Sequence, residues 1–266
     1  NPISICKALQ NKGYIDLFKK SKKHIVDKMA FSSLKKKIIY NKEQIEVIDS
    51  IKSSLKLKKF SSNLLHGVTG SGKTEIFIES IKTVMEMGKS SIVLIPEISL
   101  TPQIAGRFKD VFGEGIALWH SQLTKAQRAK TWDSINAGES KIVIGARSAI
   151  FSPIKNLGLI IVDEEHDASY KQESPSPRYH ARDVAIMRGK IENCSVVLSS
   201  ATPSLETFYN YKVKKHNYLS LPKRYGVAVY PKVKVVDLID ESRETGKFNI
   251  IISGTLQQKI EERLNN

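Results

Sequence analysis

The chain has 266 residues, of which 41% are hydrophobic and 26% charged, and it carries a net charge of +15 at pH 7. These proportions are typical of a globular protein with one large domain, and no apolar run approaches the ~18 residues of a membrane span. The first residues also lack the pattern of a signal peptide. Cys6 and Cys194 lie far apart without metal-ligand spacing, which favours buried thiols in the reducing cytoplasm.

Positive charge is concentrated at the start of the chain. Residues 1–60 contain fifteen lysines and no arginine against five acids, a net of +10. Such a segment can bind phosphate backbones without sequence preference, but a solvated face on a lysine-rich protein explains the charge equally well. Because the sequence begins at Asn1 and not at Met, we expect it to be a piece of a longer protein.

The helical and extended pattern becomes regular at Asn41. Residues 1–40 are lysine-rich and weakly periodic, and are interpreted as the tail of a preceding region plus a linker. Asn41 can cap a helix in which Ile45, Ile48 and Ile51 recur on one face.

After this helix, short apolar runs alternate with amphipathic stretches. Strands are expected at residues 63–65, 91–95, 116–119, 141–144, 159–162, 195–198 and 232–238. Helices are expected at 75–87, after Thr101-Pro102, and after Ser253 with Leu256, Ile260 and Leu264 facing inward. Near-continuous apolar strands separated by helices predict an α/β fold, a doubly wound and mostly parallel sheet with helices on both faces.

A glycine-rich loop follows the first expected strand. Residues 67–74 read GVTGSGKT and fit the pattern G-x-x-x-x-G-K-[ST], in which backbone amides surround phosphates. Lys73 would reach the outer phosphates and Thr74 would bind Mg²⁺, although a Gly/Ser turn before a helix is the simpler alternative. The predicted nucleotide-binding residues are Gly67, Val68, Thr69, Gly70, Ser71, Gly72, Lys73 and Thr74.

A second motif, Asp163-Glu164-Glu165-His166, follows the apolar run LIIV. Asp163 is expected to hold Mg²⁺, and Glu164 to orient or deprotonate the attacking water. The alternative is an N-cap with acids in the first helical turn. His166 either couples nucleotide state to neighbouring loops or caps the turn. With the glycine loop, these residues predict nucleotide hydrolysis with Lys73, Asp163 and Glu164 as catalytic residues.

Seven segments in this order resemble the first motor lobe of the PriA family, the primosomal replication-restart helicases of superfamily 2 with a DEAH-type motif. They are GVTGSGKTEIF, LIPEISLTPQ, LWHSQL, GARSAIF, VDEEHDASYKQ, PRYHARD and SSATPS, within residues 40–204. The resemblance implies a RecA-like P-loop NTPase lobe of an ATP- and Mg²⁺-dependent 3′-to-5′ DNA helicase. It further implies a cytoplasmic monomer that acts on forked or single-stranded DNA with single-strand-binding protein and a helicase loader.

The family pattern adds assignments for Gln44 and Thr101. Gln44 matches the position that reads the adenine edge, since an amide both donates and accepts; otherwise it is a polar helix-surface residue. Thr101 begins a helix similar to the motif that grips the DNA backbone, where free amides favour a phosphate.

Two more segments resemble elements that contact DNA or couple it to the nucleotide. Arg147 and Ser148 in GARSA resemble a second backbone-gripping loop, with a helix-start ion pair as the alternative. Ser200 and Thr202 resemble the motif that links nucleotide state to DNA binding, and the two hydroxyls can equally cap a helix before Pro203.

The segment 167–180 (DASYKQESPSPRYH) is the part most specific to PriA-like proteins. Tyr170, Lys171, Tyr179 and His180 give this loop an aromatic and basic character, and aromatic rings stack on unpaired bases at ~1–3 kcal/mol each. The resemblance implies a loop that senses DNA and triggers hydrolysis. A glycine expected before Pro-Arg-Tyr is absent, which puts the flexibility of the loop in question.

Two family features are missing from the chain. The zinc-binding cysteines are absent, and so is the second motor lobe with its arginine finger, without which hydrolysis loses a factor of ~10³ or more. We therefore expect three parts: 1–40, the tail of a winged-helix-like DNA-binding region; 41–240, the ATP-binding lobe; and 241–266, the start of a connection to a second lobe. The rivals are another superfamily 2 translocase and a DNA-binding module with a vestigial nucleotide site.

Overall fold

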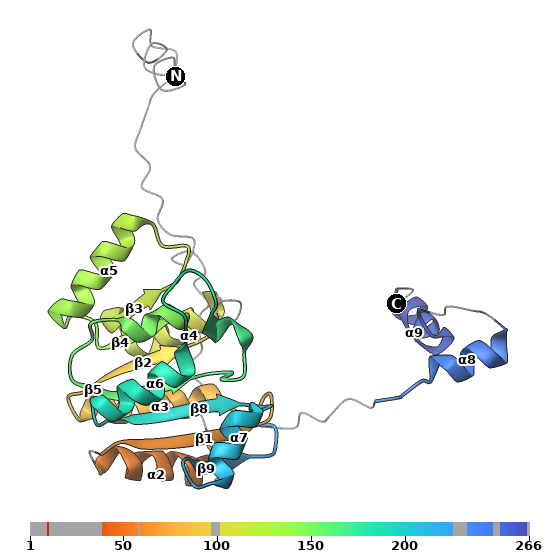
Figure 1. Ribbon diagram of the computed structural model, residues 1–266, viewed down its shortest axis with the longest axis horizontal. Helices are drawn as coiled ribbons and strands as arrows, with labels where there is room; N and C mark the ends of the chain where they lie inside the picture. Colours follow the sequence, from red (N-terminus) through yellow and green to blue (C-terminus); the bar gives the residue numbers. More distant parts are fainter. Residues whose placement is uncertain are drawn as a thin grey trace. The chain divides into compact units, whose positions relative to one another are not determined.

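A parallel sheet lies between layers of helices within residues 39–225 (Figure 1). The computed structural model describes residue 10 and residues 39–57, 59–96, 102–225, 233–246 and 251–264. In this part of the chain the strands are β1 (Ser61–Gly67), β2 (Ser90–Leu94), β3 (Ile116–Trp119), β4 (Ile142–Gly145), β5 (Leu157–Val162), β8 (Ser195–Ser200) and β9 (Asn217–Leu221). Their order is β3-β4-β2-β5-β8-β1-β9, and every neighbouring pair is parallel. The predicted α/β fold is confirmed.

The two faces of the sheet bury two separate cores, because alternate residues of a strand point to opposite sides. The helices are α2 (Lys42–Lys56), α3 (Lys73–Glu86), α4 (Pro102–Phe112), α5 (Lys125–Ala137), α6 (Ala181–Ile191) and α7 (Leu205–Lys212). Val93 and Ile161 pack with α2, α3 and α4, whereas Ile92 and Ile160 pack with α5 and α6. Helices on both faces make the fold doubly wound and place the strand ends at one edge.

Local sequence signals explain the ends of these helices. Asn41 caps α2, and Gln44 completes a capping box by accepting from the Asn41 amide at 3.0 Å. Gly88, at φ +70°, follows the end of α3, where a left-handed residue is needed. Of the three apolar positions expected to recur along α2, Ile48 and Ile51 are buried, whereas Ile45 is 47% exposed.

The last strand was assigned to the wrong segment. Residues 233–237 form no strand, and helix α8 (Leu238–Thr245) begins where the expected strand ends. Val233 and Val235 are both exposed, so the alternation of Lys and Val covers no core there. The edge of the sheet is instead β9, which pairs with β1 and buries only Leu219 and Leu221. So short a pattern is easily missed in a sequence.

The chain separates into two compact units, Asn1–Tyr225 and Gly226–Asn266. In the second unit, Ser253 caps helix α9 (Gly254–Leu264) by accepting from the Leu256 amide at 3.1 Å, as predicted. However, the three apolar side chains expected to face inward are exposed: Leu256, Ile260 and Leu264. Each helix that the structure describes is too short or too polar to cross a membrane. Residues 1–40, interpreted as the tail of a preceding region plus a linker, lie almost entirely outside the described residues.

Candidate nucleotide and DNA site

The glycine loop joins β1 to α3 at the edge of the sheet where the strands end. Gly70 (φ +79°) and Gly72 (φ +86°) take left-handed conformations that residues with a Cβ adopt only at a cost. Gly72 is the N-cap of α3 and supplies no side-chain bond to the first amides of the helix. These amides therefore point to the loop, where the helix dipole and free N–H groups favour an anion.

The interior of the loop fits a phosphate chain. A Cβ on Gly67 would lie 2.9 Å from Ser71 Oγ, so only glycine leaves the space there open. The buried Ser71 Oγ has no hydrogen-bond partner among the described residues. Lys73 Nζ donates to the Gly67 carbonyl at 3.0 Å and reaches across the loop. The cavity beside the loop has a volume of about 620 Å³, a size suited to a nucleotide.

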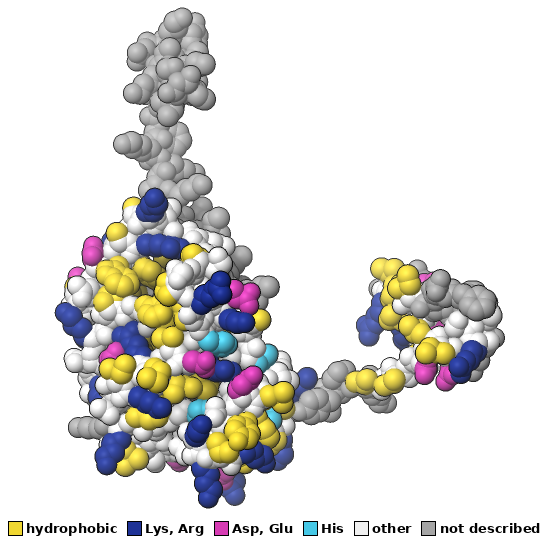
Figure 2. All heavy atoms as spheres, in the orientation of Figure 1, with side chains coloured by type: hydrophobic (Ala, Val, Ile, Leu, Met, Phe, Trp, Pro, Cys, Tyr) yellow, Lys and Arg dark blue, Asp and Glu magenta, His cyan; other side chains and the backbone are white. Residues whose placement is uncertain are grey.

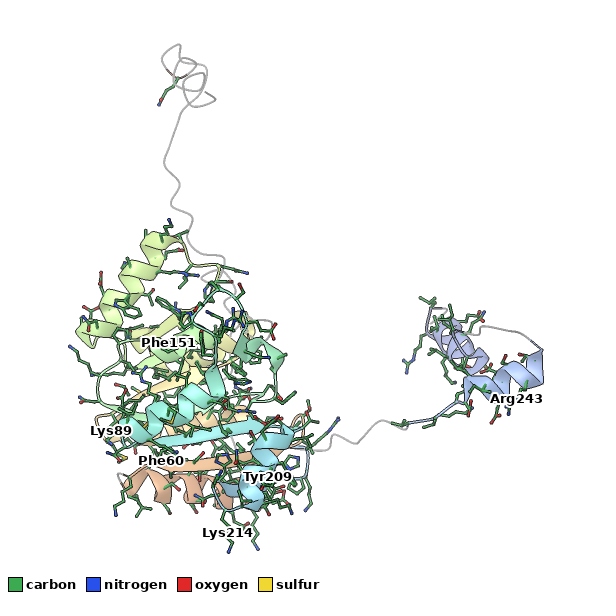
Figure 3. All side chains as sticks on the ribbon, in the orientation of Figure 1. Phe60, Lys89, Phe151, Tyr209, Lys214 and Arg243 are labelled. Atoms are coloured by element: carbon green, nitrogen blue, oxygen red, sulfur yellow. The ribbon has the colours of Figure 1, made fainter. Side chains whose placement is uncertain are left out.

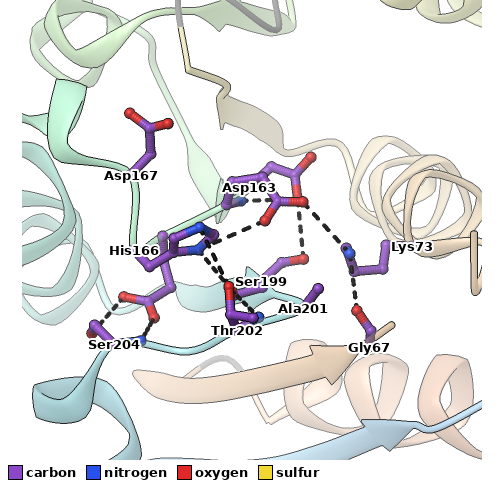
Figure 4. A network of polar contacts seen from close by, with 12 residues as sticks. Gly67, Lys73, Asp163, His166, Asp167, Ser199, Ala201, Thr202 and Ser204 are labelled. Atoms are coloured by element: carbon purple, nitrogen blue, oxygen red, sulfur yellow. Dashed lines mark hydrogen bonds and ion pairs between the residues drawn. The ribbon is translucent and has the colours of Figure 1, made fainter. Parts of the chain in front are cut away.

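The two carboxylates expected to act on the nucleotide follow β5 directly and face this cavity. Glu164 Oε1 lies 3.6 Å from Lys73 Nζ, and Asp163 accepts from Ser199 Oγ at 3.1 Å (Figure 4). Burial, and then the nearby Glu164 carboxylate, raise the pKa of Asp163 to about 6. Thr74 lines the same cavity. An Asp carboxylate and a Thr hydroxyl facing one cavity are oxygen donors that suit Mg²⁺.

Behind the motif, Glu165 is fully buried and forms a network that the sequence analysis missed. Its carboxylate accepts from the Ser204 amide at 2.7 Å, from Thr207 Oγ1 at 2.8 Å and from Arg182 Nη1 at 3.2 Å. A buried carboxylate needs such partners because desolvation is costly. The network ties DEEH to the starts of α6 and α7. Glu165, Arg182 and Ser204 belong to the motifs DEEH, PRYHARD and SSATPS. However, the partners of Glu165 lie 17 to 42 residues away from it in the chain, so the motifs alone do not show that these side chains meet.

His166 connects the carboxylates to the end of β8 (Figure 4). Its Nδ1 lies 2.7 Å from Ser200 Oγ and 3.7 Å from Glu164 Oε2, while its Nε2 lies 3.5 Å from Thr202 Oγ1. Ser200 Oγ also accepts from the Thr202 amide at 2.9 Å. The structure thus brings together the three residues predicted to couple nucleotide state to DNA, His166, Ser200 and Thr202.

The aromatic segment forms a small antiparallel hairpin, β6 (Lys171–Gln172) with β7 (Tyr179–His180), after the 3-10 turn η5 (Ala168–Tyr170). Tyr170 is 0% exposed and its Oη donates to the Asp163 carbonyl at 2.6 Å. Burial raises the pKa of this phenol well above its usual range. The expectation that Tyr170 stacks on DNA bases is therefore wrong. Its ring is buried in the core, and its hydroxyl is hydrogen-bonded to the backbone of the DEEH turn.

The other aromatic and basic residues of this region lie nearer the surface. Tyr179 is half-buried and packs edge-on against Phe151, with ring centroids 5.0 Å apart. Lys171 is exposed and faces Glu173 at 3.0 Å. Arg147, at the start of η4 (Arg147–Phe151), donates to the Lys171 carbonyl at 3.0 Å. The predicted backbone-gripping loop and the aromatic hairpin are therefore neighbours.

Gln44 lies beside the nucleotide cavity but its amide is already engaged. The side chain is 1% exposed, donates to the Ser71 carbonyl at 2.9 Å and accepts from the Asn41 amide at 3.0 Å. Reading of adenine by this amide requires that one of these bonds be exchanged. The assignment of Thr101 falls outside the described residues, and those described contain no group of three metal-ligating side chains.

Tyr225 is a cavity-lining residue that no motif indicated. It follows β9, its amide donates to the Gly70 carbonyl at 2.8 Å, and its Oη donates to the Ile39 carbonyl at 2.9 Å. Arg107, on α4, lines the same cavity and forms an ion pair with Glu75. Tyr225 was overlooked because β9 was not predicted, so nothing placed the following residues at the strand ends.

Comparisons with known proteins agree with this geometry. The family model described as DEAD/DEAH box helicase matches residues 41–210. The chain is 44% identical over 260 residues to the replication restart protein PriA of Chlamydia muridarum, covering 98% of this chain and 34% of that protein. It is 46% identical over 222 residues to PriA of Bacillus subtilis, covering 84% and 27% respectively. The resemblance to the PriA family is confirmed, and the chain spans about a third of the length of these relatives.

A solved structure of RecG bound to a three-way DNA junction shares the fold. It superimposes with a TM-score of 0.54 at 22% identity, covering 72% of this chain and 25% of that one. The likeness is one of architecture, the RecA-like α/β lobe.

Proposed function

The chain belongs to the DEAD/DEAH box helicase family, and from this premise we propose that it is the ATP-binding first motor lobe of a replication-restart DNA helicase. The parent protein would translocate 3′ to 5′ on DNA at stalled forks, in the cytoplasm, with single-strand-binding protein and a helicase loader as partners. The names of the curated relatives, replication restart proteins, support the replication-restart part of this proposal. The rest of the parent would contribute the second lobe and its arginine.

One observation carries the proposal. The glycine loop, DEEH and the end of β8 meet in one place, with Lys73 3.6 Å from Glu164 and His166 2.7 Å from Ser200. Bound with Mg²⁺, ATP would supply the phosphoanhydride bond whose hydrolysis drives movement. Gly67–Thr74 would hold its phosphates and Asp163 with Thr74 would hold the metal ion. Glu164 would orient the attacking water and accept its proton.

Coupling to DNA would run from this site along two paths of direct contact. In one, Glu164 faces His166, which contacts Ser200 and Thr202. In the other, the carbonyl of Asp163 accepts from Tyr170, which begins the aromatic hairpin. Arg147 donates to the Lys171 carbonyl. A DNA strand bound by Arg147 and Ser148 would therefore shift the hairpin, and through it the position of the Asp163 and Glu164 carboxylates.

The first rival, another translocase of the same superfamily, is opposed by the aromatic hairpin. The second, a DNA-binding module with a vestigial nucleotide site, is opposed by the contact of Lys73 with Glu164 in an open cavity.

Nucleotide binding and ATPase activity, each with and without forked DNA, test the proposal. Lys73→Ala should weaken binding of a fluorescent ATP analogue at least about tenfold, since it removes a charge-assisted contact to phosphate. Lys82→Ala, on the exposed side of the same helix, is the matched control and should bind normally. In the full-length parent, which would supply the arginine of the second lobe, forked DNA should raise the ATPase rate. Equal nucleotide binding in the two variants would remove the assignment.

A further inference from the structure

Both tryptophans of the chain lie together at one edge of the sheet. Trp119 ends β3, the outermost strand on that side, and Trp132 projects from α5. Their ring centroids are 5.7 Å apart with the planes inclined at 52°. Trp132 is 40% exposed and Trp119 is half-buried, so an aromatic surface remains open to solvent.

A positive charge belongs to the same cluster. The guanidinium of Arg128 lies over the Trp119 ring, 6.0 Å from its centroid, and Arg128 Nη2 donates to the Ser121 carbonyl at 3.2 Å. Arg128 and Trp132 are four residues apart on α5 and so share one face of the helix. In the sequence of α5 the cations Lys125, Arg128 and Lys130 stand against a single acid, Asp133.

The cluster is joined to the loop that we assign to the DNA backbone. Trp119 Nε1 donates to Ser148 Oγ at 3.0 Å, and the Trp119 carbonyl accepts from the Ala146 amide at 3.1 Å. The ring of Trp119 is thereby held beside Arg147 and Ser148. A strand whose phosphates contact these residues would have its bases within reach of the tryptophans.

Packing on the sheet accounts for only part of this arrangement: Trp119 packs against the buried core, whereas Trp132 contacts it from α5 and stays 40% exposed. The buried part of α5 is Ile135, and its capping box at Thr124 and left-handed Gly138 determine where the helix begins and ends. Trp132 takes no part in these caps, and its large apolar ring is 40% exposed. Figure 2 shows hydrophobic side chains interleaved with Lys and Arg side chains on the face below α5. Aromatic rings beside cations are the composition of surfaces that bind single-stranded nucleic acids.

We propose that Trp119, Arg128 and Trp132 form a base-stacking platform for single-stranded DNA. The inference rests on the proposed function and extends it, because it places bases next to the backbone held by the loop of Arg147. Trp132 offers the exposed ring, Trp119 supports it, and Arg128 adds a cation for a neighbouring base or phosphate. Stacking accepts any base, so the platform carries no sequence preference.

The test compares two single-stranded probes of equal length, an oligothymidylate and an abasic oligodeoxynucleotide, by fluorescence anisotropy. The complete 266-residue chain is used with the variants Trp132→Ala and Trp132→Phe. Tyr209→Ala is the matched control, since this exposed tyrosine lies on α7, away from the cluster (Figure 3). Trp132→Ala should weaken oligothymidylate binding about fivefold to a hundredfold, whereas Trp132→Phe should retain binding. All variants should bind the abasic probe equally.

Tryptophan emission gives an independent readout, because the two indoles of the chain are both in the cluster. Oligothymidylate should quench the wild type, and the abasic probe should not. If the wild type binds oligothymidylate and Trp132→Ala binds it equally well, the platform is overturned while the proposed function stands. An equal loss on both probes would likewise overturn stacking. If the wild type binds neither probe, both the platform and the proposed function fail.

Discussion

The phosphate loop (residues 67–74) and the aromatic segment (residues 167–180) are both loops at the strand ends, yet they differ in how they work. In the first, backbone amides and the left-handed Gly70 and Gly72 form the site. In the second, side chains are expected to do the work, and their exposure depends on the fold: Tyr170 is buried, whereas Tyr179 is half-buried. A motif therefore predicts a backbone conformation more securely than it predicts which side chains are exposed.

The two loops meet at DEEH, where neighbouring residues have opposite environments. Glu164 faces the open cavity and Lys73, while Glu165 points the other way into a closed network with Arg182 and Ser204. The turn between them is unusual, since Glu164 has a φ of +45°. One acid is thus free to act on a ligand, and the next holds the surrounding elements together.

The largest expected effect distinguishes these two acids. Glu165→Ala should lower the free energy of unfolding by about 3–5 kcal/mol, because it leaves Arg182 and several donors buried without their partner. Glu164→Ala, whose ion pair with Lys73 is partly exposed, should cost less than about 1 kcal/mol. Urea denaturation measures both. Similar losses for the two variants would contradict the division of roles.

The next largest effect is the difference in stability between variants of the two tyrosines of the aromatic segment, Tyr170 and Tyr179. Tyr170→Ala should cost about 3–5 kcal/mol of unfolding free energy through the cavity it leaves, and Tyr170→Phe about 1 kcal/mol through the lost bond to Asp163. Tyr179→Ala should cost less than Tyr170→Ala, because the Tyr179 ring is only half-buried, and in the parent protein it should reduce stimulation of the ATPase by DNA. Thermal unfolding and ATPase assays check this. If both alanine variants unfold alike, the contrast between the tyrosines is lost.

Gly72 in the loop of residues 67–74 can be compared with Gly88, which follows α3. An alanine at Gly72 must adopt φ +86° and place its Cβ 2.4 Å from Gln44 Nε2, which is itself bonded to the Ser71 carbonyl. Gly72→Ala should cost about 1–3 kcal/mol of stability and weaken nucleotide binding. Gly88→Ala is the control, since it shares the left-handed conformation but meets nothing within 4 Å. It should cost about 1–2 kcal/mol and leave nucleotide binding unchanged.

The smallest expected effect concerns pH. With a pKa raised to about 6, Asp163 is protonated below that pH, so Mg²⁺ must displace a proton there. Magnesium-dependent nucleotide binding should weaken up to about tenfold for each pH unit below 6. Without metal, the pH dependence of stability runs the other way. Between about pH 4 and about pH 6 the unfolded chain loses the Asp163 proton while the folded protein keeps it, so the free energy of unfolding should fall as pH rises. Titrations with wild type and Asp163→Asn check both, and a variant with the same pH profile would exclude Asp163.

The amino-acid sequence by itself determined the position of the glycine loop, six strands of the sheet, the start of α2 and the end of α3. These depend on local properties: apolar runs of strand length, the side chain of Asn41, and the conformational freedom of Gly72 and Gly88. Because parallel strands end at one edge, the motifs that follow them also had to meet there. Local chemistry and topology were sufficient for this part.

Only the tertiary structure decided which side chains are buried and what they contact. Tyr170 enters the core, Glu165 gathers partners from α6 and α7, Tyr225 reaches the phosphate loop after the overlooked β9, and Trp119 meets Trp132. The physical reason is common to all four. Burial and pairing are set by residues distant in the chain, whereas composition and spacing describe only the residue's own neighbourhood.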